Sequence, residues 1–299
     1  MNERKSRPQP SPNWDRVDGV IGKEKRESLA DLRVAVIGQG SLGSEIARLL
    51  AMAGVGKFTL VDPDKLDASN VVRHVAGLTR LGEFKVKSVG DHIKHDKNPA
   101  ADIWAVAADA RLEPLLLARS DLVIISGLGS NARQAEIAEI TRNAGVTTLV
   151  AGVYQAGKGG EVFVIRPDED TPCYSCIVSY LGKTVDQEKI RQGKFVYGLA
   201  EDEIQAVPAL AIDVNRIATI AADFALKLLL HEPIHAHPNV NLLLFANKRM
   251  KIGTNGKGQD LTLEPLETQW VALPKDKNCL VCTNPATDIS LESLLKKQV

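Results

Sequence analysis

The stretch RVAVIGQGSLGSEIARLLAMAGVGKFTLVD, residues 33–62, decides the fold. Its β-branched beginning, residues 33–37, predicts a buried parallel strand. Residues 44–53 place apolar side chains at helical spacing, and two glycines end that helix. Residues 57–62 predict the next strand. Together these segments predict a right-handed βαβ unit, which begins an α/β fold with a Rossmann-like, mainly parallel sheet.

The loop GQGSLG joins the first strand to the helix. Its glycines let the backbone approach a phosphate, and the helix start offers free N–H groups at the positive end of the helix dipole. A carboxylate at the end of the second strand can accept hydrogen bonds from ribose hydroxyls. NAD binding is the usual interpretation of such a unit, and a turn that only packs helix on strand is the structural alternative. The predicted nucleotide contacts are Gly38, Gly40, Ser41, Leu42, Gly43 and Asp62.

A dense polar segment follows the second strand and favours ATP over NAD. An enzyme that transfers AMP builds negative charge on phosphate oxygens and needs cations placed to meet it. Arg73 can supply a planar fork, and Lys85 a point charge. Asn70 can donate or accept near the phosphates, and Asp64 could hold a metal or order the loop. Taken alone, either cationic side chain could be an ordinary surface residue. Their position after the strand that ends at the predicted ribose contact indicates a catalytic role.

Residues 38–89, GQGSLGSEIARLLAMAGVGKFTLVDPDKLDASNVVRHVAGLTRLGEFKVKSV, resemble the ATP-binding core of the ThiF/MoeB/HesA family. This is the adenylating half of ubiquitin-activating-type enzymes, and the resemblance runs from about residue 16 to residue 282. It implies an adenylyltransferase that uses ATP and Mg²⁺ to adenylate the C-terminal carboxylate of a small ubiquitin-like or sulfur-carrier protein, with release of pyrophosphate.

The resemblance also implies roles for particular residues. It implies that Arg16, from an N-terminal segment, reaches into the partner subunit's site, which requires a homodimer. His74 stands where many relatives carry glutamine, and we expect it to be a hydrogen-bonding loop residue without a catalytic role. The implied ribose contact is Asp62, and the implied phosphate or metal contacts are Asp64, Asn70, Arg73 and Lys85.

All four cysteines of the chain occur in two CxxC pairs. Two such pairs make the ligand set of a closed tetrathiolate zinc site, and the long gap means that a late segment folds back on a mid-chain one. The same arrangement is typical of the resembled family, where the zinc is structural. Two redox dithiols or buried free thiols are the alternatives. The predicted Zn²⁺ ligands are Cys173, Cys176, Cys279 and Cys282.

If zinc holds all four thiols, no cysteine remains as a nucleophile. The chain could then adenylate a carboxylate without carrying it as a thioester. Ser179 and Thr184 could form an oxyester only with a base to activate them, so we do not expect one.

Leu128 marks a departure from the family pattern. Relatives carry a metal-binding aspartate at this place, in the loop after a strand that begins near residue 121. Leucine cannot ligate magnesium, which prefers oxygen ligands. Either Asp64 and the substrate phosphates hold the metal, or the chain is a nucleotide-binding pseudoenzyme that partners an active enzyme. Adenylation of a small peptide and an NAD-dependent oxidoreductase are further alternatives.

The remaining sequence sets the organisation of the 299-residue chain. The net charge is zero, which gives no electrostatic case for nucleic acid or a membrane, and without a signal peptide or long apolar run we expect a cytoplasmic protein. We expect a flexible tail over residues 1–13 and an ATP-binding part over residues 14–150. Residues 151–299 should form the zinc-containing, partner-protein-binding part of the same adenylation domain.

The later half contains several predicted elements. A strand, glycine turn and strand cover residues 152–165, and the resemblance implies antiparallel strands and a groove for the partner protein here. Residues 181–206 suggest a mobile crossover loop or a plain surface insertion. Residues 208–230 predict a buried helix, which we expect at a dimer contact. Further predicted elements are a helix at 135–143, strands at 147–151, 241–245 and 249–252, and a helical tail at 289–297.

Overall fold

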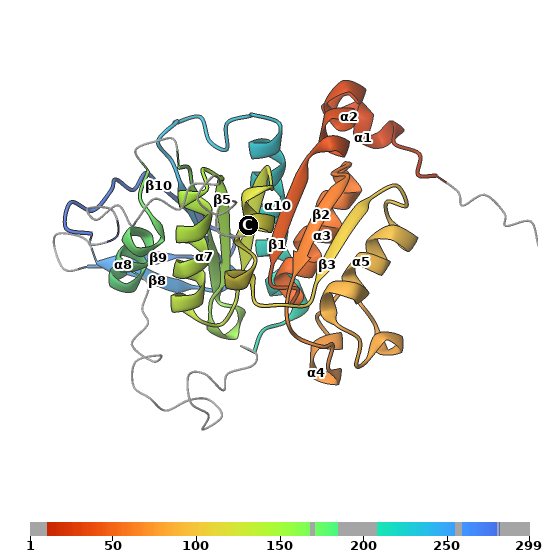
Figure 1. The fold of residues 1–299 in the computed structure, drawn as a ribbon. Helices are drawn as coiled ribbons and strands as arrows, with labels where there is room; N and C mark the ends of the chain where they lie inside the picture. Colours follow the sequence, from red (N-terminus) through yellow and green to blue (C-terminus); the bar gives the residue numbers. More distant parts are fainter. Residues whose placement is uncertain (1–10, 168–170, 185–207, 255–258, 280, 282–299) are drawn as a thin grey trace, which may run out of the picture.

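The computed structural model describes residues 11–167, 171–184, 208–254, 259–279 and 281. An eight-stranded sheet runs through its centre, with helices packed on both faces (Figure 1). The strand order is β10-β7-β6-β5-β4-β1-β2-β3. The predicted α/β fold with a mainly parallel sheet is confirmed.

Five neighbouring strands are parallel. The first βαβ unit is the predicted one, although its helix α3 begins at Ser41, three residues before the predicted start. The edge strand β3 was not predicted, although Ile103 to Val106 are apolar, and none of its side chains is fully buried. The five strands are β1 (Arg33–Ile37), β2 (Lys57–Val61), β3 (Asp102–Val106), β4 (Leu122–Ser126) and β5 (Thr148–Val153).

The remaining strands of the large sheet are antiparallel, as the family resemblance implied. The hairpin after β5 pairs Gly152 with Glu161, and the next strand pairs Glu161 with Leu244. A separate two-stranded sheet lies beside them. The antiparallel strands are β6 (Gly159–Ile165), β7 (Leu242–Ala246) and β10 (Thr268–Val271), and the small sheet contains β8 (Met250–Thr254) and β9 (Asp260–Leu263).

Two apolar clusters fill the spaces between the sheet and its helices. One contains side chains of α3, α5 and α10, and the other contains side chains of α6, α7 and α8. The predicted helix at 208–230 is buried against α3 and β5 within the chain, so its apolar faces do not require a dimer. These helices are α3 (Ser41–Ala53), α5 (Lys85–Asp96), α6 (Pro114–Ala118), α7 (Asn131–Asn143), α8 (Tyr174–Thr184) and α10 (Ala211–Leu229).

The N-terminal helices α1 (Asp15–Ile21) and α2 (Lys23–Asp31) lie at the end of the sheet where β1 begins (Figure 1). The short α4 (Ala68–Val71) lies at the opposite end. Among the described residues, no helix has both the length and the apolar character that a membrane crossing needs. Three 3₁₀ turns complete the described elements, η1 (Leu78–Arg80), η2 (Ala110–Leu112) and η3 (Gln155–Gly157).

Several predictions fall on residues outside the described ranges. They are the tail before residue 11, the crossover loop from residue 185 onward, Cys282 and the helical tail at 289–297. The beginning of the predicted crossover loop is instead the end of α8.

Candidate functional site

The glycine loop between β1 and α3 is closed against the end of β4. The Ser126 hydroxyl lies 2.7 Å from the carbonyl oxygen of Ile37 and 2.8 Å from that of Gly38, and donates to this pair. Gly38 adopts a φ of +87°, which favours glycine. A Cβ at Gly43 would overlap the Gly38 carbonyl oxygen and the Ser126 hydroxyl. The outer glycines therefore give the loop its shape, and Ser126 holds it.

Gly40 leaves space for a ligand. A Cβ at this position would have no atom within 4 Å. Gly40 is also the N-cap of α3, and no described side chain caps that helix. The first N–H groups of the helix, from Ser41, Leu42 and Gly43, are therefore donors without intrahelical partners, at the positive end of the helix dipole. This is the arrangement that binds phosphate.

Asp62 follows β2 and is only 6% exposed. One carboxylate oxygen accepts from the backbone N–H of Gln39 at 2.6 Å, and the other from that of Asp64 at 2.8 Å. Burial raises the pKa of Asp62, while the charge of Lys85 lowers it. Asp62 therefore ties the glycine loop to the next segment, and the predicted ribose contact would add to that role.

Lys85 begins α5, and its side chain is 11% exposed. Its Nζ donates to Asp64 at 2.7 Å, and its backbone N–H donates to the Asp64 carbonyl oxygen at 2.9 Å. The Asp64 side chain is mostly exposed. The structure thus brings Asp62, Asp64 and Lys85 together beside the glycine loop.

The segment that carries Asn70 and Arg73 is ordered by a capping box around α4. Asp67 accepts from the N–H of Ser69 at 2.8 Å, and the Asn70 side chain accepts from the N–H of Asp67 at 3.2 Å. The Asn70 carbonyl oxygen then accepts from the N–H of Arg73 at 2.9 Å. Arg73 is half-buried. Their contact with phosphate stays a prediction, but their local geometry is defined.

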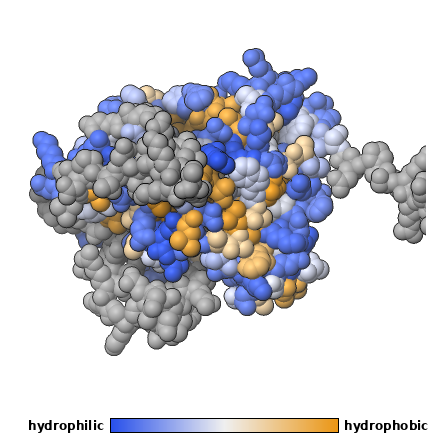
Figure 2. Space-filling view, viewed as in Figure 1, coloured by the Kyte–Doolittle hydropathy of each residue, from blue (hydrophilic) through white to orange (hydrophobic). Residues whose placement is uncertain are grey.

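Apolar side chains are exposed along the same loop. Figure 2 shows apolar and hydrophilic residues mixed over this face, with apolar ones gathered along its middle and lower part. Exposed apolar surface of this kind can be buried by association. The loop's exposed members are Val72, Leu78, Leu81 and Phe84.

Leu128, the predicted departure from the family pattern, lies beside the glycine loop. Its Cδ2 would be 2.9 Å from a Cβ at Gly38, so the leucine covers the glycine loop from the β4 side. The same side chain packs against the apolar cluster beneath α7. No acidic residue occurs in the sequence from Ser126 to Ala135.

Arg16 is not part of this site within the chain. It is exposed on α1, and the end of α2 bonds to the start of β2 through the N–H of Lys57 and the carbonyl oxygen of Leu32 at 3.2 Å. These contacts place α1 and α2 at the opposite end of the sheet from the glycine loop (Figure 1).

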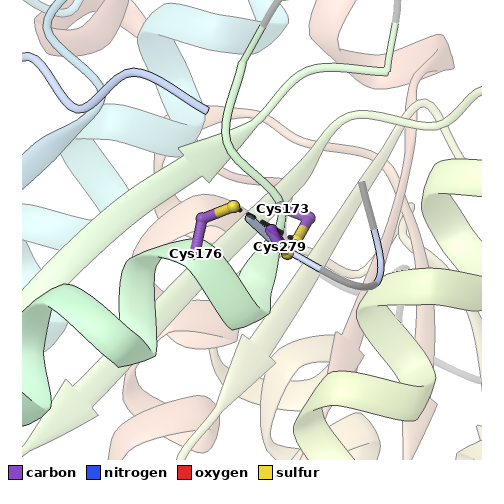
Figure 3. Close-up of side chains that lie close together, drawn as sticks. All are labelled: Cys173, Cys176 and Cys279. Carbon is purple, nitrogen blue, oxygen red and sulfur yellow. Dashed lines mark hydrogen bonds between the residues drawn. The ribbon is translucent and has the colours of Figure 1, made fainter. Parts of the chain in front are cut away.

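Three cysteines converge at the start of α8 (Figure 3). The Cys173 Sγ lies 3.7 Å from that of Cys176 and 3.6 Å from that of Cys279, and all three residues are buried. The N–H of Asp276 points at the Cys176 sulfur at 3.5 Å. Sulfurs around one tetrahedral zinc are separated by about 3.8 Å, since each Zn–S bond is about 2.3 Å. The cluster therefore fits a zinc ion, and Cys282, the predicted fourth ligand, lies outside the described residues.

Glu161 is a half-buried acid that the sequence analysis did not single out. A Cβ at Gly152 would overlap its carboxylate, so the side chain lies across that glycine. One carboxylate oxygen and the hydroxyl of Tyr154 are both buried, and the two side chains interact with each other. Burial raises the pKa of Glu161 to about 7. The sequence feature that could have pointed to Glu161 is its position as a lone acid between two glycines and an apolar run.

Sequences of known proteins are similar to much of this chain. The sequence model of the family described as "ThiF family" matches residues 16–260. The molybdopterin-synthase adenylyltransferase of Salmonella typhimurium is 33% identical over 169 residues, which are 54% of this chain and 64% of the relative. The tRNA threonylcarbamoyladenosine dehydratase of Bacillus subtilis is 40% identical over 94 residues, 31% of this chain and 37% of the relative. The chain thus spans less than two thirds of the length of these relatives.

Solved structures share the fold. Crystal structures of Escherichia coli MccB, including one with ATP, superpose with a TM-score of 0.63 to 0.64. In these two structures the identity is 16%, and the match covers 86% of this chain and 68% of the other.

Proposed function

Because the chain belongs to the ThiF family, we propose that it binds ATP across the glycine loop and transfers AMP to a small ubiquitin-like or sulfur-carrier protein. The acceptor is the C-terminal carboxylate of that protein, and pyrophosphate is released. One observation carries the proposal: the open backbone at Gly40, the buried Asp62 and the cation Lys85 share one edge of the sheet. Relatives named as adenylyltransferases of molybdopterin synthase and of a sulfur carrier support the choice of substrate.

The reaction needs positioning and charge more than covalent chemistry by the protein. A carboxylate oxygen of the tail attacks the α-phosphorus, and the bond to the pyrophosphate oxygen breaks. Asp62 would hold the ribose, and the α3 N–H groups would hold phosphate oxygens. Arg73 and Lys85 would meet the charge on the α-phosphate and the leaving group, while Asn70 would donate to a phosphate oxygen.

The described residues do not provide a complete magnesium site. Leu128 supplies no oxygen, and the Asp64 carboxylate is engaged by Lys85. Mg²⁺ keeps several waters and is commonly carried by substrate phosphates. We therefore assign to Mg²⁺ no residue other than Asp64 and derive no step through it.

The cysteine cluster fits a structural Zn²⁺. Its soft thiolates would tie the segment after β10 to the start of α8, and Cys282 would complete the set. With every thiol used in this way, the chain would not carry the tail as a thioester. The acyl adenylate would pass to another protein, and neither Ser179 nor Thr184 is needed.

We also propose that the active form is a homodimer. Arg16 is far from the glycine loop of its own chain and would act only in the site of a partner subunit. The exposed apolar side chains near α4 are surface that association with another protein would cover.

A second candidate is a nucleotide-binding partner without catalysis, which Leu128 favours because it removes the family's metal ligand. Adenylation of a peptide is a third, and NAD-dependent oxidation a fourth that leaves Arg73, Lys85 and the cysteines unexplained.

Exchange of labelled pyrophosphate into ATP tests the lead proposal. The purified protein is assayed with a panel of small proteins that end in glycine, and Arg73→Ala is the negative control. Exchange that depends on one of these tails and disappears in the variant is the expected result. Binding of ATP without exchange for any tail would favour the second candidate.

A further inference from the structure

His74 joins the two halves of the nucleotide site. Its Nε2 lies 2.7 Å from the carbonyl oxygen of Gln39 in the glycine loop, and its Nδ1 accepts from the backbone N–H of Ala76 at 3.0 Å. The side chain is buried. Since Nδ1 must accept a hydrogen bond, the proton must lie on Nε2, which donates to Gln39.

We propose that His74 is a positioning residue: as a neutral imidazole protonated on Nε2, it holds the glycine loop at a fixed distance from the Asn70–Arg73 segment. The inference rests on the proposed nucleotide site. It adds a residue that does not touch the nucleotide and acts by positioning the glycine loop and the Asn70–Arg73 segment. It further implies that nucleotide affinity falls when acid protonates this imidazole.

The backbone of Gln39 explains how the His74 contact can influence nucleotide binding. Its N–H donates to Asp62 at 2.6 Å, and its carbonyl oxygen accepts from His74 at 2.7 Å. The loop is thus held from two sides, directly before the N–H groups of α3. We call the hydrogen bond between His74 and Gln39 the tie. At its other end, the backbone N–H of His74 donates to the Asn70 carbonyl oxygen at 3.0 Å, and Arg73 is the preceding residue. Loss of the imidazole contact would free the phosphate-binding N–H groups to move relative to Arg73.

The surroundings disfavour the charged imidazole. Burial lowers the pKa of His74, and the positive charge of Lys85 and the nearby His92 lower it further, while the bond to Gln39 opposes this. Asp62 is the acid nearest in the hydrogen-bond network, through Gln39. A proton on Nδ1 would face the Ala76 N–H and break that bond. At neutral pH the imidazole is therefore held at both nitrogens, by Gln39 and by Ala76. As pH falls through the depressed pKa, the bond from Ala76 is lost while Nε2 can still donate to Gln39, so the ring is no longer fixed relative to the Asn70–Arg73 segment.

The test compares two substitutions whose predicted effects differ. In His74→Gln the amide nitrogen can donate to Gln39 and the amide oxygen can accept from Ala76, without a titratable group. In His74→Leu both bonds are lost. His95→Gln, on the exposed side of α5, is the matched control. The probe is ATP, and its affinity is measured by calorimetry from pH 5.5 to pH 8 on the full chain, with thermal unfolding as the check of folding.

At pH 8 we expect His74→Gln to bind ATP within about threefold of the parent and His74→Leu to bind it at least tenfold more weakly. Towards pH 5.5 the parent and His95→Gln should lose affinity more steeply than His74→Gln. Equal affinities for a folded His74→Leu, or equal acid dependence for the parent and His74→Gln, would overturn the inference.

A measurement without nucleotide separates this inference from the proposed function. Nitrogen-15 spectra of the free protein give the tautomer of each histidine. A His74 signal protonated on Nε2 alone at pH 7 is expected, and protonation on Nδ1 would overturn the inference. If the parent binds no ATP at any pH, the proposed function fails, while the tautomer still decides whether the tie exists.

Discussion

Lys85 bonds twice to Asp64: its Nζ donates to the carboxylate at 2.7 Å, and its backbone N–H donates to the carbonyl oxygen at 2.9 Å. The two contacts close the loop from residue 64 to residue 85 at its base. They also hold a cation beside Asp62, whose pKa burial raises and the charge of Lys85 partly lowers again. A charge placed in advance meets a phosphate without a further ordering cost.

Lys85→Met should weaken ATP binding about tenfold or more, because a hydrogen bond to a charged group contributes about 1.5–3 kcal/mol. Calorimetric titration measures the change. Lys87→Met, on the same helix, removes a cation that pairs with Glu83 and Asp91 at the surface, and should leave the ATP affinity within about twofold. Equal losses in both variants would mean that only net charge matters.

Much of the parallel half of the fold was predictable. Strands β1 and β4 are buried at every position, so their β-branched sequences carry an unambiguous signal. The edge strand β3 was missed: its apolar run neither alternates nor is β-branched throughout, so it does not separate a strand from a helix.

The site was predictable only where local motifs define it. The glycine loop, Asp62 and the cluster of Cys173, Cys176 and Cys279 lie as the motifs indicated. Ser126 and His74 act on the loop from 88 and 35 residues away in sequence. No local pattern reports such contacts, which exist only once the sheet has formed.

Leu128→Asp tests whether the chain lacks a needed metal ligand. Since the leucine packs over Gly38 and our account does not require an acid there, we expect pyrophosphate exchange to stay unchanged or to fall. The assay uses the same acceptor protein for parent and variant at several Mg²⁺ concentrations. A rise of tenfold or more would show that the parent is an impaired catalyst, and would favour the non-catalytic candidate.

The cysteine cluster should hold one zinc per chain, which elemental analysis of the purified protein measures. Cys279→Ser removes a ligand of the described cluster, so the protein should lose zinc and unfold at a temperature lower by several degrees. Ser175→Ala, at an uninvolved position between two ligands, is the control for a change in this helix. A metal-free parent with the same unfolding temperature as Cys279→Ser would contradict the zinc assignment.

Glu161 gives the chain a pH-dependent stability. The folded state holds the carboxyl proton up to a pKa of about 7, against an ordinary value of 4.5. Because the folded state binds more protons, the free energy of unfolding falls as pH rises from about 4.5 to about 7 and then levels off. Glu161→Gln removes this loss, so it should be more stable than the parent by about 1–3 kcal/mol at pH 8 and nearly equal to it at pH 4.5. Urea unfolding at both pH values measures the difference, and a variant that is less stable at pH 8 would show that the carboxylate is stabilised by its surroundings.

The most direct test of the account is calorimetric titration of the zinc-loaded protein with ATP, with and without Mg²⁺, beside a titration with NAD. We predict that ATP binds, more tightly with Mg²⁺ than without it, and that NAD does not. Binding of NAD in place of ATP would contradict the account. It would indicate that the glycine loop is the NAD-binding loop of an oxidoreductase.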